Sequence, residues 1–197
     1  MTHNEGHIAG LVLAAGAGRR LGGRPKALLV HRGRPLVEHA VTTLRTAGLT
    51  RVHVVLGAAA DVVRETARLE GCAVVENAGW AEGMGASLRA GLASVAGTDT
   101  RAVLVSLVDQ PGIGPEAVRR VLEAYEGVDT LASAAYDGVR GHPVLFGAAH
   151  WAGVAKAATG DQGARGYLRA HEVRLVECGD VAEAYDIDVE ADLRRLE

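Results

Sequence analysis

The chain has 197 residues, 48% of them hydrophobic, and a formal net charge of -3 at pH 7. This length predicts one globular domain over residues 1–197, with residues 1–6 as a flexible tail. The lack of a basic excess argues against nucleic acid or an anionic membrane surface as a partner. No apolar run approaches the roughly 18 residues of a membrane-spanning helix, and no signal-peptide core precedes the first strand, so a cytoplasmic protein is expected. Cys72 and Cys178 lack metal-site spacing and indicate neither a disulfide framework nor zinc.

Apolar, β-branched runs that predict strands alternate along the chain with amphipathic patterns that predict helices. The strands are expected at 8–14, 52–57, 72–77, 102–108, 130–136, 142–146 and 173–177, and helices at 35–48, 59–71, 115–127 and 189–197. Fully apolar strands indicate burial on both faces, which predicts an α/β fold: a Rossmann-like three-layer sandwich with a mostly parallel sheet.

Two features of this order locate the chemistry. Only DGVRG (137–141) separates the fifth and sixth strands, which is too short for a parallel crossover, so the sheet should be mixed and contain a hairpin. Ligands of open α/β sheets bind outside the carboxyl ends of the strands. The loops after the first and fourth strands should therefore face each other and carry the site.

The first of these loops is rich in glycine and cations, in the stretch LVLAAGAGRRLGGRPK (11–26). It fails the P-loop pattern, because Arg24-Pro25-Lys26 follows the glycines, and it fails the dinucleotide fingerprint, because Leu21 stands where a third glycine is needed. What remains is a glycine loop that can wrap a triphosphate, with Arg20 and Lys26 as its cations. A tight turn with solvated arginines is the alternative.

Acidic residues follow the fourth predicted strand and recur near the end of the chain. Asp109 comes directly after the strand and could hold Mg2+ against nucleotide phosphates, although it could also cap a helix. Asp186 and Asp188 flank Ile187, so in an extended segment both face one side while the isoleucine faces the core. Either could be the second metal-proximal acid, and Asp188 could instead be the N-cap of the last helix.

The run EGMGASLRAGL (82–92) predicts a short helix that begins with glycines. Its free N–H groups and the Ser87 hydroxyl could contact the edge of a base. Simple capping of the helix by Ser87 is the alternative.

Six motifs in order resemble the molybdenum cofactor cytidylyltransferases, a family of nucleotidyltransferases. They are L-A-A-G-x-G-x-R-L-G-x-x-x-K (13–26), N-x-x-W-x-x-G-M-x-x-S-L (77–88), V-D-Q-P (108–111), R-G-H-P-V-L-F (140–146), G-D-Q-G-A-R (160–165) and D-I-D-V-E-A-D-L (186–193). The resemblance spans nearly the whole chain and implies the fold of the nucleotide-diphospho-sugar transferases. Departures at Gly18, Leu21, Val189 and Ala191 remove no charged group and bear mainly on the substrate.

The resemblance implies a Mg2+-dependent transfer of CMP from CTP to a molybdopterin-type cofactor, with release of pyrophosphate. A molybdenum hydroxylase apoenzyme is a possible recipient of the product. The implied catalytic residues are Lys26, Arg20 and Asp109, and the implied metal ligands are Asp109 and Asp188. The implied nucleotide-binding residues are Leu13, Ala14, Ala15, Gly16, Gly18, Gly22, Lys26, Gly83 and Ser87. The implied acceptor-binding residues are His142, Asp161 and Arg165.

The resemblance also suggests that Ala15 bears on the choice of base, because a methyl group there would crowd a purine where guanylyl-transferring relatives keep glycine. Three other functions stay open at this point. The first is nucleotidyl transfer to another phosphorylated acceptor. The second is an oxidoreductase activity on pigments, which is described for a few proteins that resemble this family. The third is a maturation chaperone that binds the pterin without catalysing a reaction.

Overall fold

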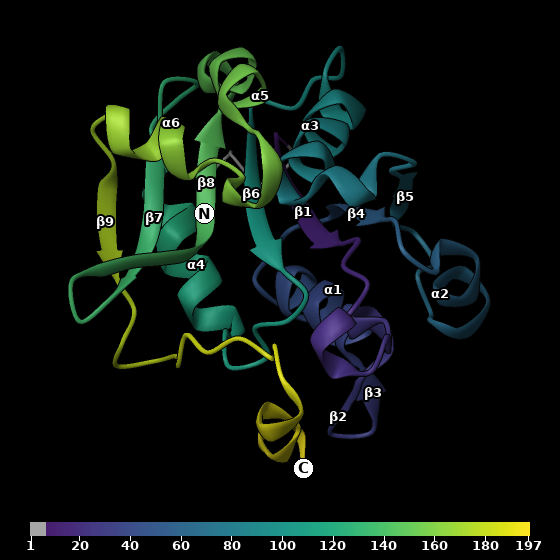
Figure 1. Cartoon of the computed structure of the whole chain (residues 1–197). Helices are drawn as coiled ribbons and strands as arrows, with labels where there is room; N and C mark the ends of the chain where they lie inside the picture. Colours follow the sequence, from purple (N-terminus) through teal and green to yellow (C-terminus); the bar gives the residue numbers. More distant parts are fainter. Residues whose placement is uncertain (1–6) are drawn as a thin grey trace.

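The structure, a computed structural model, describes residues 7–197, so the flexible tail expected for residues 1–6 lies outside the described residues. Seven strands form the main sheet in the order β5-β4-β1-β6-β8-β7-β9 (Figure 1). Their bounds are β1 Ile8–Ala14, β4 Arg51–Leu56, β5 Ala73–Glu76, β6 Ala102–Leu107, β7 Leu131–Tyr136, β8 Val139–Gly147 and β9 Arg174–Glu177. Strand β8 pairs antiparallel with β6 and β7, and the other pairs are parallel. The prediction of a mostly parallel, mixed sheet is confirmed.

The antiparallel excursion is a tight hairpin between β7 and β8. Its two connecting residues, Asp137 and Gly138, both have positive φ, at 51° and 75°. Asp-Gly with two positive φ angles is the preferred composition of a type I′ hairpin turn. The short connection therefore produces the hairpin that it predicts, although β8 begins three residues before the expected 142–146 run.

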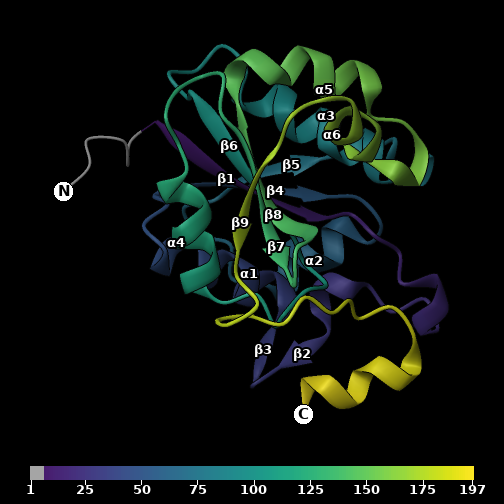
Figure 2. The same ribbon diagram turned by 90° about the vertical axis from the view of Figure 1, so that its left-hand side faces the viewer.

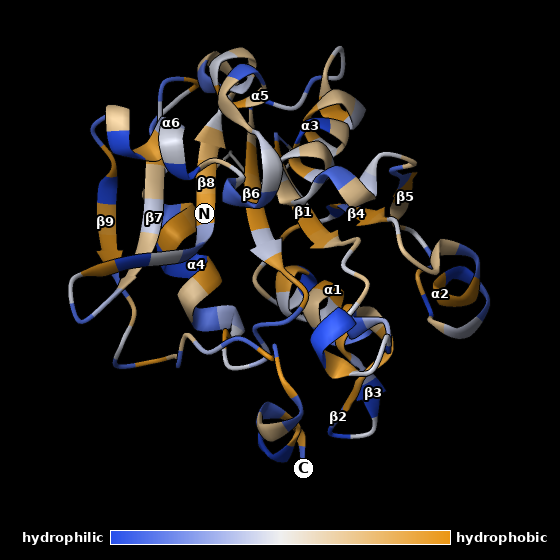
Figure 3. Cartoon of the chain, in the orientation of Figure 1, coloured by the Kyte–Doolittle hydropathy of each residue, from blue (hydrophilic) through white to orange (hydrophobic). Residues whose placement is uncertain are grey.

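Helices cover both faces of the sheet and make the three predicted layers (Figure 2). On one face lie α1 (Leu36–Thr46), α2 (Ala60–Thr66) and α4 (Pro115–Glu123), and on the other α3 (Met84–Val95), α5 (Trp151–Ala157) and α6 (Arg165–Ala170). Alternate residues of β1 serve the two cores, with Val12 facing α1 and Leu11 facing α3. The central strands are accordingly hydrophobic, whereas the segment after β1 includes strongly hydrophilic residues (Figure 3).

Short elements complete the chain and differ most from expectation. The strands β2 (Val30–His31) and β3 (Arg34–Pro35) form a small hairpin of their own, and α5 has no counterpart among the predicted helices. The helix expected over 59–71 ends at Thr66, and that expected over 189–197 is a 3-10 helix, η6 (Glu190–Leu196). The remaining 3-10 turns are η1 (Arg19–Leu21), η2 (Lys26–Leu28), η3 (Trp80–Glu82), η4 (Ala148–His150) and η5 (Gly160–Gln162).

Two further expectations concern the thiols and the membrane. Cys178 is buried, Cys72 is half-buried, and both are free thiols. Within residues 7–197, no helix has the length and apolar character that crossing a membrane requires.

Close packing of α3 against the end of α5 positions the site. A Cβ atom on Gly85 would lie 2.8 Å from the Ala158 carbonyl carbon and 2.8 Å from the Thr159 nitrogen. Only a residue without a side chain permits this approach, which holds η5 over the start of α3.

We expect Gly85→Ala to lower the free energy of unfolding by about 1–3 kcal/mol, because backbone atoms must move to admit the methyl group. The matched control is Gly166→Ala in α6, where a Cβ would meet nothing within 4 Å. That control should raise the free energy of unfolding by roughly 0.5–1 kcal/mol. Urea denaturation of both variants measures the difference, and a Gly85→Ala protein as stable as the wild type would contradict the packing described.

Candidate functional site

Two adjoining cavities open at the carboxyl ends of β1 and β6. The first, here the loop cavity, has a volume of about 480 Å³ and the second, the hairpin cavity, about 460 Å³. Each is within the size range of small-molecule sites. Five residues line both cavities: Leu13, Met84, Leu107, Arg165 and Asp186.

The glycine loop after β1 forms one wall of the loop cavity. Gly18, Gly22 and Gly23 have φ angles of 60°, 69° and 76°, and the Gly18 carbonyl accepts hydrogen bonds from the backbone N–H groups of Leu21 and Gly23. Leu21 is fully buried and packs in the core, which accounts for a leucine at the place of a third glycine. The loop is therefore anchored at Leu21 while its glycines follow left-handed turns that other residues rarely adopt.

Lys26, at the start of η2, lies between two carboxylates. Its Nζ donates to Asp109 Oδ2 at 2.6 Å and also to Asp188 Oδ1. The side chains of Lys26 and Asp109 are 15% and 17% exposed. Burial by itself lowers the pKa of Lys26, but the two carboxylates outweigh it and raise the pKa, so the lysine stays charged. Burial raises the pKa of Asp109 against the attraction of Lys26.

The C-terminal segment reaches this cluster through backbone and core contacts. The Ile187 N–H donates to the Asp109 carbonyl at 2.9 Å, and the Ile187 side chain is fully buried, as its position predicts. Asp188 then meets Lys26 and also accepts from Arg20 at 3.3 Å. Asp186 instead accepts from Gln110 Nε2 at 2.7 Å. Of the two acids that sequence left open, Asp188 is the one paired with Lys26.

The side chain of Asp188 pairs with Lys26 and does not cap η6, whose N-cap residue is Val189. The Asp192 carboxylate accepts the backbone N–H groups of Asp188 and Val189, each at 2.9 Å. The N-cap residue of η6 is Val189, and Asp192, its third residue, supplies the returning bond of a capping box, so the alternative of Asp188 as N-cap is not observed.

Two carboxylates that converge on one cation suit a hard divalent ion. Mg2+ prefers oxygen ligands and is commonly held by one or two carboxylates together with substrate phosphates. Among residues 7–197, no group of three or more His, Cys, Asp or Glu side chains is arranged to hold a metal. Asp109 and Asp188 supply oxygen ligands of the kind that Mg2+ takes together with phosphate oxygens.

The loop cavity is also lined by Ala15, Trp80, Gly83 and Ser87. A Cβ on Gly57 would lie 2.8 Å from that of Ala15 and would clash with that of Trp80, so Gly57 allows the two walls to meet. A Cβ on Gly83 would lie 2.6 Å from Asp161 Oδ1. The start of α3 is thus bordered by a carboxylate from a segment distant in sequence.

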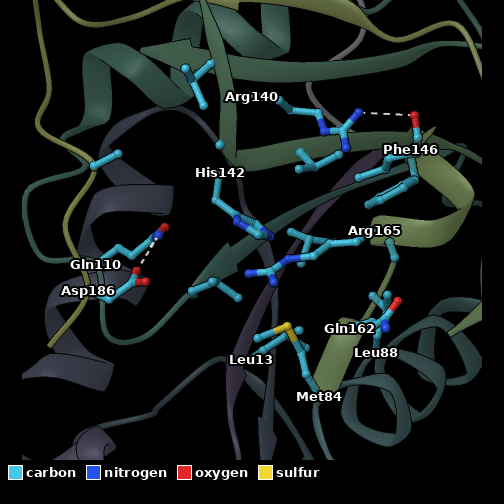
Figure 4. A pocket seen from close by; sticks show the side chains of 18 of the residues that line it. Leu13, Met84, Leu88, Gln110, Arg140, His142, Phe146, Gln162, Arg165 and Asp186 are labelled. Atoms are coloured by element: carbon cyan, nitrogen blue, oxygen red, sulfur yellow. Dashed lines mark hydrogen bonds between the residues drawn. The ribbon is translucent and has the colours of Figure 1, made fainter. Parts of the chain in front are cut away.

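The hairpin cavity combines an apolar floor with cationic and polar side chains (Figure 4). Its apolar lining residues, here called its floor, include Leu88, Val144 and Phe146. The Arg165 guanidinium lies beside the His142 imidazole. Burial lowers the pKa of His142 to about 4, against the carboxylate of Asp186. The imidazole is therefore neutral near pH 7, and the fixed positive charge here comes from arginine.

Most residues singled out by sequence meet around the two cavities. The loop cavity is lined by Leu13, Ala15, Gly16, Gly18, Arg20, Lys26, Gly83, Ser87, Asp109 and Asp188. Ala14 and Gly22 do not line it: Ala14 faces the opposite core, because strand residues alternate, and Gly22 is exposed after η1.

The three expected acceptor residues are divided between the cavities. His142 lines the hairpin cavity, Asp161 the loop cavity, and Arg165 both. Sequence reasoning left Arg19 aside, but it lines the loop cavity with Arg20, because η1 turns both toward it. Arg24 instead holds the loop, donating to the Leu21 carbonyl at 3.0 Å. Sequence reasoning did not identify Gln110 and Met84, which line the hairpin cavity. The only signal for them in the sequence is that they directly follow Asp109 and Gly83.

The sequence profile of the MobA-like NTP transferase domain matches residues 10–175. A protein named nicotine blue oxidoreductase, from Paenarthrobacter nicotinovorans, is 41% identical over 198 residues, and the alignment covers 96% of each chain. A molybdenum cofactor guanylyltransferase from Acidiphilium cryptum is 53% identical over 38 residues, which are 19% of each chain.

Among solved structures, that of Rv0371c from Mycobacterium tuberculosis H37Rv matches with a TM-score of 0.81 and 32% identity, covering 96% of this chain and 97% of that one. The structure of Rv0371c in complex with manganese matches with a TM-score of 0.76 and 30% identity over the same shares. The fold is thus similar along nearly the whole length of both chains.

The lowered pKa of His142 predicts a pH dependence of stability. Between about pH 6.5, its ordinary pKa, and about pH 4, the unfolded chain binds a proton that the folded chain does not, so stability falls as the pH falls. His142→Gln should make the free energy of unfolding less steep in this window, by up to about 1.4 kcal/mol per pH unit.

Denaturant titrations of wild type and His142→Gln at a series of pH values measure this slope. Part of it should persist, because burial also lowers the pKa values of His39 and His53. Equal slopes in the two proteins would show that His142 is not held neutral by its cavity.

Proposed function

Since the chain belongs to the MobA-like NTP transferase family, we propose that it transfers CMP from CTP to a molybdopterin-type molybdenum cofactor and releases pyrophosphate. The observation that carries the proposal is the Lys26–Asp109–Asp188 cluster, which lies in a cavity with a glycine loop and adjoins a second cavity. Membership of a nucleotidyltransferase family favours a nucleoside triphosphate as the first substrate. The charged side chains of Lys26, Asp109 and Asp188 in one cavity favour the same substrate.

The reaction requires positioning and charge neutralisation more than acid-base chemistry. A terminal phosphate oxygen of the acceptor attacks the α-phosphorus of CTP, a new P–O bond forms, and the bond to the β-phosphate oxygen breaks as pyrophosphate leaves. The phosphate nucleophile is already ionised near pH 7, so no side chain has to remove a proton. A reaction without proton removal needs no free base, and in the cluster both carboxylates are paired with Lys26.

Each member of the cluster has a role in this scheme. Asp109 and Asp188 would hold Mg2+ together with phosphate oxygens, and the ion would neutralise charge on the leaving pyrophosphate. Lys26 remains charged and supplies a fixed cation for the phosphate that is attacked. Arg20, whose side chain is 70% exposed, can leave Asp188 at small energetic cost to bind the triphosphate.

The two cavities divide the substrates between them. We assign the base to the end of the loop cavity near Ala15 and Ser87, where the Ala15 methyl group favours a pyrimidine over a purine. The acceptor would occupy the hairpin cavity, whose apolar floor suits a ring system better than a polyhydroxylated sugar. Arg165 lines both cavities and would bind the acceptor phosphate at their boundary.

A second candidate is a pigment oxidoreductase, which the 41% identity with nicotine blue oxidoreductase favours. The apolar floor of the hairpin cavity could equally accept a flat dye. Against it, the loop after β1 lacks the third glycine of a dinucleotide fingerprint, since Leu21 is buried at that place.

The deciding experiment incubates the protein and Mg2+ with molybdenum cofactor and CTP, GTP or ATP in turn, and measures pyrophosphate and the dinucleotide product. We expect product from CTP and, because of the Ala15 methyl group, little from GTP. Parallel reactions contain NADH or NADPH with nicotine blue and follow pigment reduction. Reduction of the pigment without any nucleotide product would overturn the proposal in favour of the oxidoreductase, and product from GTP alone would overturn the assignment of Ala15.

A further inference from the structure

A chain of hydrogen bonds with a defined direction leads from the turn before η3 to the loop cavity. It begins at the Gly79 backbone N–H, which donates to Asn77 Oδ1 at 3.0 Å. A backbone N–H can only donate, so the oxygen of the Asn77 amide must face Gly79 and its nitrogen must face the other way. Asn77 is 8% exposed, so its orientation is fixed by protein contacts.

The second link joins Asn77 to α3. Asn77 Nδ2 donates to Ser87 Oγ at 3.1 Å, and Ser87 is 4% exposed and lines the loop cavity. An amide nitrogen can only donate, so the serine oxygen accepts this bond and its own proton is left to donate elsewhere. Among residues 7–197, no group accepts a hydrogen bond from the Ser87 hydroxyl.

Another serine of the same helix shows the usual alternative. Ser94 Oγ donates back to the Gly91 carbonyl in the preceding turn at 2.7 Å. Serines inside helices commonly satisfy their hydroxyl in this way. Ser87, the fourth residue of α3, does not.

We propose that Asn77 is a positioning residue that makes the Ser87 hydroxyl a hydrogen-bond donor toward the nucleotide base. The inference rests on the proposed function and adds to it a requirement on the ligand. The base must present an acceptor, such as a pyrimidine carbonyl oxygen or a ring nitrogen, where it meets α3. An amino group at that place could donate only to the remaining lone pair of Ser87 Oγ and would leave the serine proton without an acceptor, so it would bind less well.

The substitution that tests this is Asn77→Asp, because it keeps the shape and reverses one bond. A carboxylate accepts from both the Gly79 N–H and the Ser87 O–H. The Ser87 O–H then donates to this carboxylate and is no longer available to the base, which meets only lone pairs of the serine oxygen. Calorimetry in the presence of Mg2+ measures the binding of CTP and, as a probe without a base, of inorganic tripolyphosphate.

In Asn77→Asp we expect the affinity for CTP to fall about tenfold, the loss of one hydrogen bond, while the affinity for tripolyphosphate stays unchanged. The tripolyphosphate measurement separates loss of base recognition from repulsion by the new charge or from partial unfolding. Ser87→Ala should weaken CTP binding to a similar degree, and Ser94→Ala, in the same helix, should leave it unchanged.

A double-mutant cycle then asks whether Asn77 acts through Ser87. In the Ser87→Ala background, Asn77→Asp should produce no further loss of CTP affinity. Additive losses would show that Asn77 affects binding by another route and would overturn the inference, as would wild-type CTP affinity in Asn77→Asp. If the wild-type protein binds tripolyphosphate but gains nothing from the nucleoside, the base subsite and with it the proposed function fall together.

Discussion

The charge pairing of Lys26 with Asp109 and Asp188 joins three segments that are far apart in the sequence. Lys26 follows β1, Asp109 follows β6, and Asp188 lies in the C-terminal segment after β9. Two carboxylates at this distance repel one another unless a cation lies between them, and a half-buried lysine needs an anion. The conformation of the glycine loop and the course of the C-terminal segment both follow from satisfying these charges in one place.

The same constraint explains why the site is suited to an anionic ligand that carries its own dication. Lys26 and the largely exposed Arg20 pair with the two carboxylates, and Arg19 and Arg165 line the same cavity as further cations. A triphosphate with Mg2+ would add charges of both signs and satisfy the acids and the arginines together. The apolar floor under β8 and the polar cluster beside it thus form two halves of one region, with Arg165 and Asp186 at the boundary.

Sequence periodicity was sufficient for the sheet, the hairpin and the meeting of Lys26 with Asp109, because neighbouring parallel strands end at the same edge. It could not choose between Asp186 and Asp188, since alternation puts both on one side of the strand. The choice depends on tertiary contacts, namely the bond from Ile187 to the Asp109 carbonyl and the bond from Gln110 to Asp186. Likewise, no local pattern places Asp161 beside Gly83; that approach depends on glycines of α3 packing against backbone far along the chain.

The central claim is that the Lys26 ammonium acts at the reacting phosphate, and the chain supplies its own control because Lys156 is its other lysine. Lys156 is exposed on α5, away from both cavities. The most direct measurement is the single-turnover rate of pyrophosphate release from Mg2+-CTP with molybdenum cofactor, in Lys26→Gln and Lys156→Gln proteins whose folding is verified by circular dichroism. The account predicts a loss of about 10²–10³-fold in Lys26→Gln and an unchanged rate in Lys156→Gln. A near-normal rate in Lys26→Gln would contradict it.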